Sequence, residues 1–187
     1  MVRARQTIVS LEDTPYYDCC YRVVRKAFLC EIDNATGDNF SLAGFSSKRR
    51  NHIRYYPIKN FNQNYDGHVI DLINAIKPGY FTRMGAAIRY ASCELAKQKS
   101  TQKLLLILTD GKPNDLDKYE SRYGIEDTKM AILEAKKMGL EPFCISIDQY
   151  ASDYLPYIFG SNCYIHLKNA HELPKKLPHL YLRLTAH

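Results

Sequence analysis

Two oxygen-bearing side chains in this sequence stand where they could hold a divalent cation. Asp110 directly follows the apolar run Leu104–Leu108, within the stretch KLLLILTDGKPND at residues 103–115. Thr82 lies in a loop just before a helical pattern. Carboxylate and hydroxyl oxygens are hard ligands that suit Mg²⁺ or Mn²⁺ better than zinc, and Mg²⁺ keeps several waters, so few protein ligands suffice. Thr82 and Asp110 are therefore the candidate metal ligands.

Both residues also have simpler structural interpretations. Thr82 stands where the N-cap of the following helix would lie, and Asp110 could make an Asx-type turn before Gly111. Residue types alone do not choose between a metal site and these local roles, so both interpretations stay open at this point.

The elements that must position these residues alternate from residue 40 onward. Strand patterns are expected at 40–47, 52–61, 103–111, 141–148 and 162–167, and helical patterns at 65–78, 81–100, 124–139 and 169–185, with a short helix or turn at 152–160. This alternation favours an α/β fold with a mostly parallel central sheet flanked by helices. Ligands of such sheets bind at the carboxyl ends of the strands, where Thr82 and Asp110 could meet.

The first part of the chain follows no single period. The stretch YRVVRKAFLCEID at 21–33 could form a strand that pairs with 40–47, with NATGDN as the turn between them. We therefore divide the chain into an N-terminal fragment at 1–39, which is a substitute strand or disordered, and a domain at 40–187.

Composition limits the class of protein. The chain has 187 residues, of which 45% are hydrophobic and 25% charged, enough for one globular domain with a real core. No apolar run is long enough for a membrane span, and the N-terminus lacks the apolar part of a signal peptide, so a cytoplasmic location is expected. The six cysteines are scattered without zinc spacing and are expected to be reduced thiols.

The net charge of +6 does not by itself identify a partner. Its one dense cluster is Lys48, Arg49, Arg50 and Arg54 in SSKRRNHIR, which is more typical of a solvated hairpin turn than of a nucleic-acid site. The sequence has no phosphate-binding loop, nucleophile elbow or Cys/His catalytic pair, so we expect no enzymatic activity.

Residues 40–185 resemble a von Willebrand factor A domain of the NorD type, the nitric oxide reductase activation proteins, and of the related CbbO type. The stretches that carry the resemblance are GFSS, IRYYPIKNF, TRMGAAIRYA, LLLILTDGKPND, DKYESRYGIEDTKMAILEAKKMGLEPFCISID and ELPKKLPHLYLRL. The resemblance implies a Rossmann-like fold with a metal-ion-dependent adhesion site, truncated here at its N-terminus so that the usual first strand and helix are missing.

The resemblance also implies which residues would bind the ion. The family's site combines a D-x-S-x-S loop, a threonine that corresponds to Thr82, and an aspartate that corresponds to Asp110. No D-x-S-x-S motif occurs in this chain; the nearest approach is DNATG at 33–37. The site is therefore expected to be incomplete and its affinity for Mg²⁺ or Mn²⁺ weak.

Residues 1–40 have a resemblance of their own, to the N-terminus of an IS200-like, REP-associated tyrosine transposase. It rests on RARQTIVSLEDTPYY and on CCYRVVRKAFLC. Those enzymes use a His-hydrophobic-His motif, and no such motif occurs here, so no catalytic residue is transferred. This resemblance leaves two alternatives open: a transposase-derived DNA-binding fragment, or a non-functional fusion product.

The resemblance to the A domain implies a non-catalytic interaction module. Its partners would be an AAA+ ATPase of the MoxR class and a target metalloenzyme such as nitric oxide reductase, whose activation or maturation the module would assist. Tyr119, Arg122 and Tyr123 could face a partner or belong to an ordered surface loop, and Asp115 and Asp117 are expected to serve as turn residues.

Overall fold

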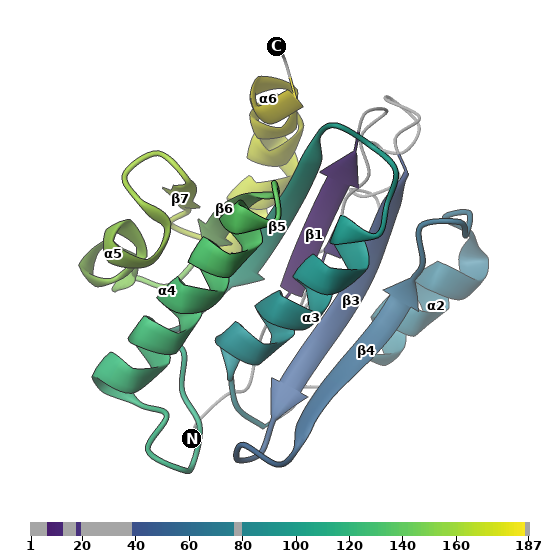
Figure 1. Cartoon of the computed structure of the whole chain (residues 1–187). Helices are drawn as coiled ribbons and strands as arrows, with labels where there is room; N and C mark the ends of the chain where they lie inside the picture. The colour runs from purple at the N-terminus through teal and green to yellow at the C-terminus, as the bar shows by residue number, and fades with distance from the viewer. Residues whose placement is uncertain (1–6, 13–17, 20–38, 77–79, 186–187) are drawn as a thin grey trace.

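The computed structural model describes residues 7–12, 18–19, 39–76 and 80–185. Its strands are β1 (Thr7–Glu12), β2 (Asp18–Cys19), β3 (Phe40–Ser47), β4 (Ile53–Lys59), β5 (Lys103–Thr109), β6 (Glu141–Ser146) and β7 (Tyr164–His166). Its helices are α2 (Gly67–Ala75), α3 (Met84–Ala96), α4 (Ser121–Lys137), α5 (Leu155–Phe159) and α6 (Leu173–Thr185), with short 3-10 turns at Ala151–Asp153 and Ala170–Glu172. The strands form one sheet between two layers of helices (Figure 1).

The sheet has seven strands in the order β4-β3-β2-β1-β5-β6-β7, and β3 also pairs with β1. β2, β3, β5, β6 and β7 run in one direction, whereas β1 and the edge strand β4 run against it. The predicted α/β fold with a mostly parallel sheet flanked by helices is confirmed. The antiparallel strand in the middle is the feature that the sequence pattern did not predict.

That strand, β1, lies between β3 and β5, where the sequence was expected to lack its first strand. Thr7 pairs with Gly44 of β3 and with Leu108 of β5, so β1 is bonded to a neighbour on each side, in reversed orientation. The stretch at 21–33, which was predicted to fill this gap, lies outside the described residues.

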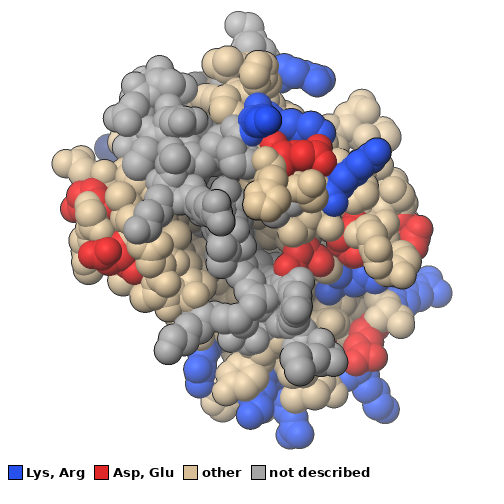
Figure 2. Space-filling model, turned by 180° about the vertical axis from the view of Figure 1, so that it is seen from behind, with Lys and Arg blue, Asp and Glu red and all other residues tan. Residues whose placement is uncertain are grey.

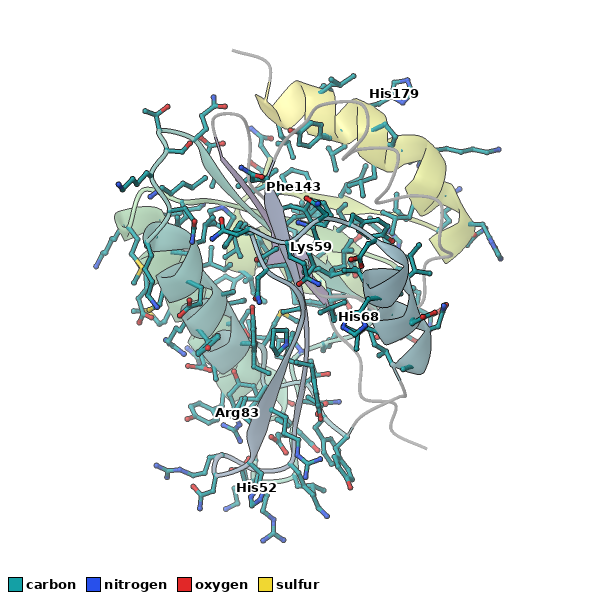
Figure 3. The ribbon with its side chains drawn as sticks, turned by 90° about the vertical axis from the view of Figure 1, so that its right-hand side faces the viewer. His52, Lys59, His68, Arg83, Phe143 and His179 are labelled. Atoms are coloured by element: carbon teal, nitrogen blue, oxygen red, sulfur yellow. The ribbon has the colours of Figure 1, made fainter. Side chains whose placement is uncertain are left out.

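Both faces of β5 are buried, which explains its continuous apolar sequence. Leu105 and Ile107 belong to the core layer beneath α3, α4 and α5. Leu104, Leu106 and Leu108 belong to the layer beneath α2 and α6 on the other face. Figure 3 shows the sheet nearly edge-on between these two layers. Alternation of side chains along the strand thus builds both halves of the core from one segment.

Two predictions from composition remain, that the cysteines are reduced and that the chain has no membrane span. Among the described residues, Cys93, Cys144 and Cys163 are free thiols. Burial raises the pKa of the Cys144 thiol, so this residue packs as a small apolar side chain. Within the described ranges, no helix combines the length and the apolar character needed to cross a membrane.

Candidate functional site

β3 and β5 end at the same edge of the sheet, and β1 begins there between them. Because β1 runs the other way, its last residue, Glu12, pairs with Lys103 at the opposite edge. In the family that the sequence resembles, the D-x-S-x-S loop follows the first strand at the carboxyl edge. The reversed strand β1 therefore has its carboxyl end at the edge opposite to Asp110.

The loop that carries Thr82 connects two other segments at this edge. Phe81 exchanges backbone hydrogen bonds with Ser47, the last residue of β3, with both N–O distances at 2.9 Å. Thr82 exchanges them with Asn114, at 2.9 and 3.1 Å, in the loop that follows β5. The loops that carry Thr82 and Asp110 therefore meet. Whether they bind an ion stays a prediction.

Thr82 is buried, with 4% of its surface exposed. It is not the N-cap of α3, because that position belongs to Arg83, whose side chain makes no capping hydrogen bond. The predicted N-cap role for Thr82 is thus wrong by one residue. The backbone bridge to Asn114, and not the helix end, fixes the position of Thr82.

Asp110 is half-buried and follows β5 directly. The turn after it is held by Thr109, whose hydroxyl donates to the Gly111 carbonyl at 2.8 Å and accepts the Gly111 amide at 3.3 Å. This pair of bonds turns the chain at the edge of the sheet, so a hydroxyl of the strand itself supplies the local turn.

Asn114 adds an oxygen that the sequence did not single out. Its side-chain Oδ1 is buried and has no hydrogen-bond partner in the described part of the chain. A buried acceptor without a partner costs about 1–3 kcal/mol, so a ligand that occupied it would stabilise the site. Amide oxygens also coordinate hard cations.

These residues fit a hard divalent cation in part. Thr82, Asp110 and Asn114 bring hydroxyl, carboxylate and amide oxygens to one edge, all of the type that Mg²⁺ and Mn²⁺ prefer. Among the described residues, no group of three or more His, Cys, Asp and Glu side chains is placed to hold a metal. The ion would have to rely on these mixed oxygens and on water.

Beneath this edge, Arg83 forms a buried cluster with two carboxylates. Its Nε lies 3.3 Å from Asp115 Oδ2, and its terminal NH2 group contacts Asp117 Oδ1. The guanidinium carbon lies 4.1 Å from the ring centroid of Tyr119, and the Arg83 amide donates to Ser47 Oγ at 3.0 Å. Figure 3 shows Arg83 beside the sheet, close to the turn that carries His52.

The two carboxylates also hold the β3–β4 turn. Asp115 Oδ1 accepts the amides of Arg49 and Leu116, each at 2.7 Å, and Asp117 Oδ2 accepts the Arg50 amide at 2.8 Å. Burial by itself would raise the pKa of the Asp115 carboxyl, but these amides, the Ser47 hydroxyl and the Arg83 charge together lower it. Asp115 and Asp117 are therefore anchors between distant segments and not merely turn residues.

A second cluster joins α3 to α4 through Tyr119. This residue is fully buried, its hydroxyl contacts Asp127, and the Gly85 amide donates to it at 3.4 Å. Burial and the bond to Asp127 raise the pKa of the Tyr119 hydroxyl. The prediction that Tyr119 could face a partner is wrong, because its side chain fills the space between the helices.

Its neighbours in the sequence behave differently. Tyr123 is 58% exposed, and the Arg122 side chain is exposed at the start of α4. Asp127 also accepts from Arg89 at 2.8 Å, and Arg89 in turn binds Glu134 at 2.6 Å. Sequence inspection missed the roles of Arg83 and Asp127, since their partners lie in other elements and no local pattern marks them.

The arrangement agrees with what comparison with known proteins finds. The family model for the von Willebrand factor type A domain matches residues 17–175. The chain belongs to this family. Its match begins inside the segment at 1–39 that we set apart. The resemblance of residues 1–40 to a transposase stays a prediction.

Three curated relatives show which members of the family the chain is similar to. The chain is 56% identical over 135 residues to protein NorD of Stutzerimonas stutzeri, covering 72% of this chain and 22% of that protein. It is 54% identical over 154 residues to an uncharacterised protein of Pseudomonas aeruginosa, covering 82% of this chain and 25% of that protein. It is 44% identical over 151 residues to protein NorD of Brucella melitensis, covering 81% of this chain and 24% of that protein. The predicted resemblance to the A domain of NorD proteins is confirmed.

The chain spans about a quarter of the length of the curated relatives it matches. No solved structure matches the chain significantly.

Proposed function

We propose that this chain is a non-catalytic interaction domain of a NorD-like accessory protein. It works in the cytoplasm with an AAA+ ATPase of the MoxR class, in the activation or maturation of nitric oxide reductase or a similar metalloenzyme. The observation that carries the proposal is the 56% identity to protein NorD of Stutzerimonas stutzeri within a von Willebrand factor type A match.

The geometry of the carboxyl edge supports a docking role. Arg83, Asp115 and Asp117 fix the loop after β5 against the β3–β4 turn, so this edge is a rigid surface. Rigid loops at the carboxyl edge of an α/β sheet are where such folds bind ligands. A surface that is ordered before binding loses less conformational entropy when a partner docks.

The ion has a limited part in this proposal. Thr82 and Asp110, with Asn114 beside them, would hold Mg²⁺ or Mn²⁺, which would supply a positive charge for a carboxylate of the partner. Because the D-x-S-x-S loop is absent from the sequence, the ion adds to the contact and is not required for all of it.

A pull-down tests the role. The tagged chain is mixed with the cognate MoxR-class ATPase, with Mg²⁺ or with EDTA, and with Asp110→Ala as the variant. We expect the ATPase to be retained in Mg²⁺ and retained less in EDTA or by the variant. Recovery of no ATPase in any condition would overturn the proposal. Equal recovery in all conditions would keep the docking role and remove the ion from it.

The alternative of a non-functional fusion product makes a different prediction. A poorly folded chain would show no cooperative unfolding transition by circular dichroism, whereas an interaction domain with two packed cores must show one. A transposase-derived fragment would bind single-stranded DNA in preference to the ATPase.

A further inference from the structure

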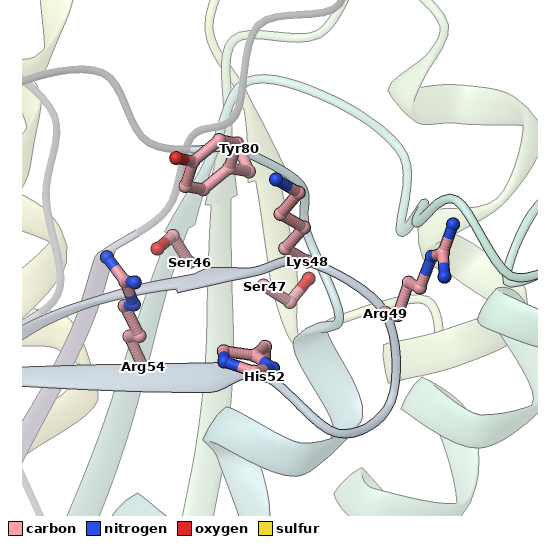
Figure 4. Close-up of a pocket in the computed structure, with 7 residues that line it drawn as sticks. All are labelled: Ser46, Ser47, Lys48, Arg49, His52, Arg54 and Tyr80. Carbon is pink, nitrogen blue, oxygen red and sulfur yellow. The ribbon is translucent and has the colours of Figure 1, made fainter.

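The turn between β3 and β4 forms one wall of a positively charged pocket with a volume of about 430 Å³ (Figure 4). Lys48 and Arg54 bring charge to it, and it is also lined by Ser46, Ser47, Arg49, His52 and Tyr80. The side chain of Arg49 extends away from Tyr80 (Figure 4). In the close-up, Lys48, Ser46 and Arg54 extend toward Tyr80 on one side of the hairpin. Neither Thr82 nor Asp110 is among the residues that line it.

Among the described residues, the basic side chains of this pocket have no acidic partner. Within the described ranges, no carboxylate forms an ion pair with the side chains of Lys48, Arg49 or Arg54. The nearest carboxylates of the loop after β5, Asp115 and Asp117, bind the backbone of the turn and the guanidinium of Arg83 instead. The described residues therefore give the pocket a net positive charge.

The turn is also fixed before any ligand arrives. Arg49 has a φ of 67°, in the left-handed region that is uncommon for residues other than glycine. Its amide is held by Asp115, and Lys48 donates its amide to the His52 carbonyl at 2.8 Å. The Lys48 ammonium lies 4.9 Å from the Tyr80 ring centroid. A strained residue held in place by its surroundings is a frequent feature of binding sites.

We propose that this pocket binds the carboxylate side chains of an acidic segment in a partner protein. Arginine and lysine donors match carboxylates, and the serine hydroxyl and histidine ring offer further donors. The pocket has room for one or two side chains. The inference rests on the proposed role as an interaction domain, but it needs neither the ion nor Asp110.

Nucleic acid fits this surface less well. Binding to a phosphate backbone requires positive charge along a continuous stripe. Here the one dense basic cluster lies in a turn, and in Figure 2 basic and acidic side chains are interspersed over the described part of the face seen there. A compact positive pocket suits a short acidic segment better than a strand of DNA.

Fluorescence anisotropy with a labelled oligoglutamate peptide tests the proposal at low ionic strength. An oligoglutamine peptide and a single-stranded oligo-dT serve as comparison probes. The test variant is the Lys48→Gln/Arg54→Gln double variant, and both residues are exposed, so the fold should persist. The matched control is Arg50→Gln/Lys168→Gln, which removes the same charge from exposed residues outside the pocket.

We expect oligoglutamate, but not oligoglutamine, to bind, and the test variant to weaken binding about tenfold. The control should change it less than about twofold, and neither EDTA nor Asp110→Ala should change it. Equal losses in test and control variants would overturn the proposal in favour of diffuse charge. Tighter binding of oligo-dT that the test variant abolishes would overturn it in favour of nucleic acid.

Two further results separate this proposal from the proposed function. Loss of peptide binding in EDTA would place the carboxylate at the ion and overturn the pocket. Retention of the ATPase in the pull-down without any peptide binding would overturn the pocket alone and leave the interaction role intact.

Discussion

Arg83 and Asp115 form an ion pair that is almost entirely buried, with 7% and 0% of their side chains exposed and 3.3 Å between Nε and Oδ2. The pair joins the start of α3 to the loop after β5. Since the same aspartate holds the Arg49 amide, the pair also reaches the β3–β4 turn. The loop of Thr82, the loop of Asp110 and the charged turn therefore depend on one cluster.

Removal of the cation from this cluster should destabilise the fold. Arg83→Met keeps much of the side-chain length but leaves Asp115 without its buried partner, and we expect a loss of about 3 kcal/mol in the free energy of unfolding. Urea denaturation measures this change. Arg50→Met, in the exposed turn, is the control and should change stability by less than about 0.5 kcal/mol. Equal effects of the two variants would contradict a structural role for Arg83.

The lowered pKa of Asp115 predicts how stability depends on pH. A carboxyl whose pKa is lower in the folded state stabilises the fold above its unfolded pKa, near 3.9, and loses this contribution as pH falls through the folded pKa. The stability difference between the wild type and Asp115→Asn should thus stay constant down to about pH 5 and shrink below about pH 4. Urea titrations at several pH values test this, and a difference that grows in acid would refute it.

Gly85 allows α3 to approach α4 closely. A Cβ atom at this position would lie 2.2 Å from Asp127 Oδ2, a carboxylate that already binds Tyr119 and Arg89. We expect Gly85→Ala to cost about 2 kcal/mol in the free energy of unfolding, because the carboxylate must move. Gly67→Ala is the matched control, since nothing lies within 4 Å of its added Cβ and alanine favours helix. Thermal unfolding of both variants decides the matter.

Local patterns predicted much of this fold. The apolar run of β5 and the helical spacing of α3 and α4 carry their own signals. A strand buried on both faces is continuously apolar, and a helix buried on one stripe repeats its apolar residues with the helical period. The end of β5 also placed Asp110 at the correct edge. The start of α3 was predicted one residue early, since caps depend on backbone angles that the sequence does not show.

Long-range relationships were not predictable in the same way. Arg83 meets Asp115 and Asp117 only after the sheet has formed, and nothing near Arg83 in the sequence marks that contact. The position of β1 was not predictable either. It depends on backbone hydrogen bonds to β3 on one side and to β5 on the other, which are distant in the sequence. TIVSLE has no strict alternation, so its pattern did not indicate a strand in the middle of the sheet.

Metal binding should be visible as a shift in thermal stability. An ion that binds only the folded state raises the midpoint, by about 5 °C at saturating Mg²⁺ or Mn²⁺ relative to EDTA. Asp110→Ala should abolish the shift, Thr82→Val and Asn114→Ala should reduce it, and Asp153→Ala, at an exposed carboxylate, should leave it intact. If the wild type unfolds cooperatively with the same midpoint in metal and in EDTA, the domain folds but binds no ion.

The reversed strand β1 gives the sharpest test of the fold itself. Ser10 pairs with Ser41 of β3 and with Leu105 of β5, so it lies within a strand that is bonded on each side. Proline lacks the amide donor and is tolerated mainly in edge strands, as Pro57 is in β4. Ser10→Pro should therefore destabilise the domain by about 3 kcal/mol or more, or prevent cooperative unfolding altogether.

The control for this variant is Ser10→Ala, which keeps the backbone donor. If β1 completes the sheet, the alanine variant unfolds close to the wild type in urea while the proline variant does not. If both variants match the wild type, residues 7–12 contribute nothing to the core. β3 and β5 would then expose unpaired edges in the middle of the sheet, a state that should aggregate. Light scattering on the same samples therefore separates a completed sheet from an open one.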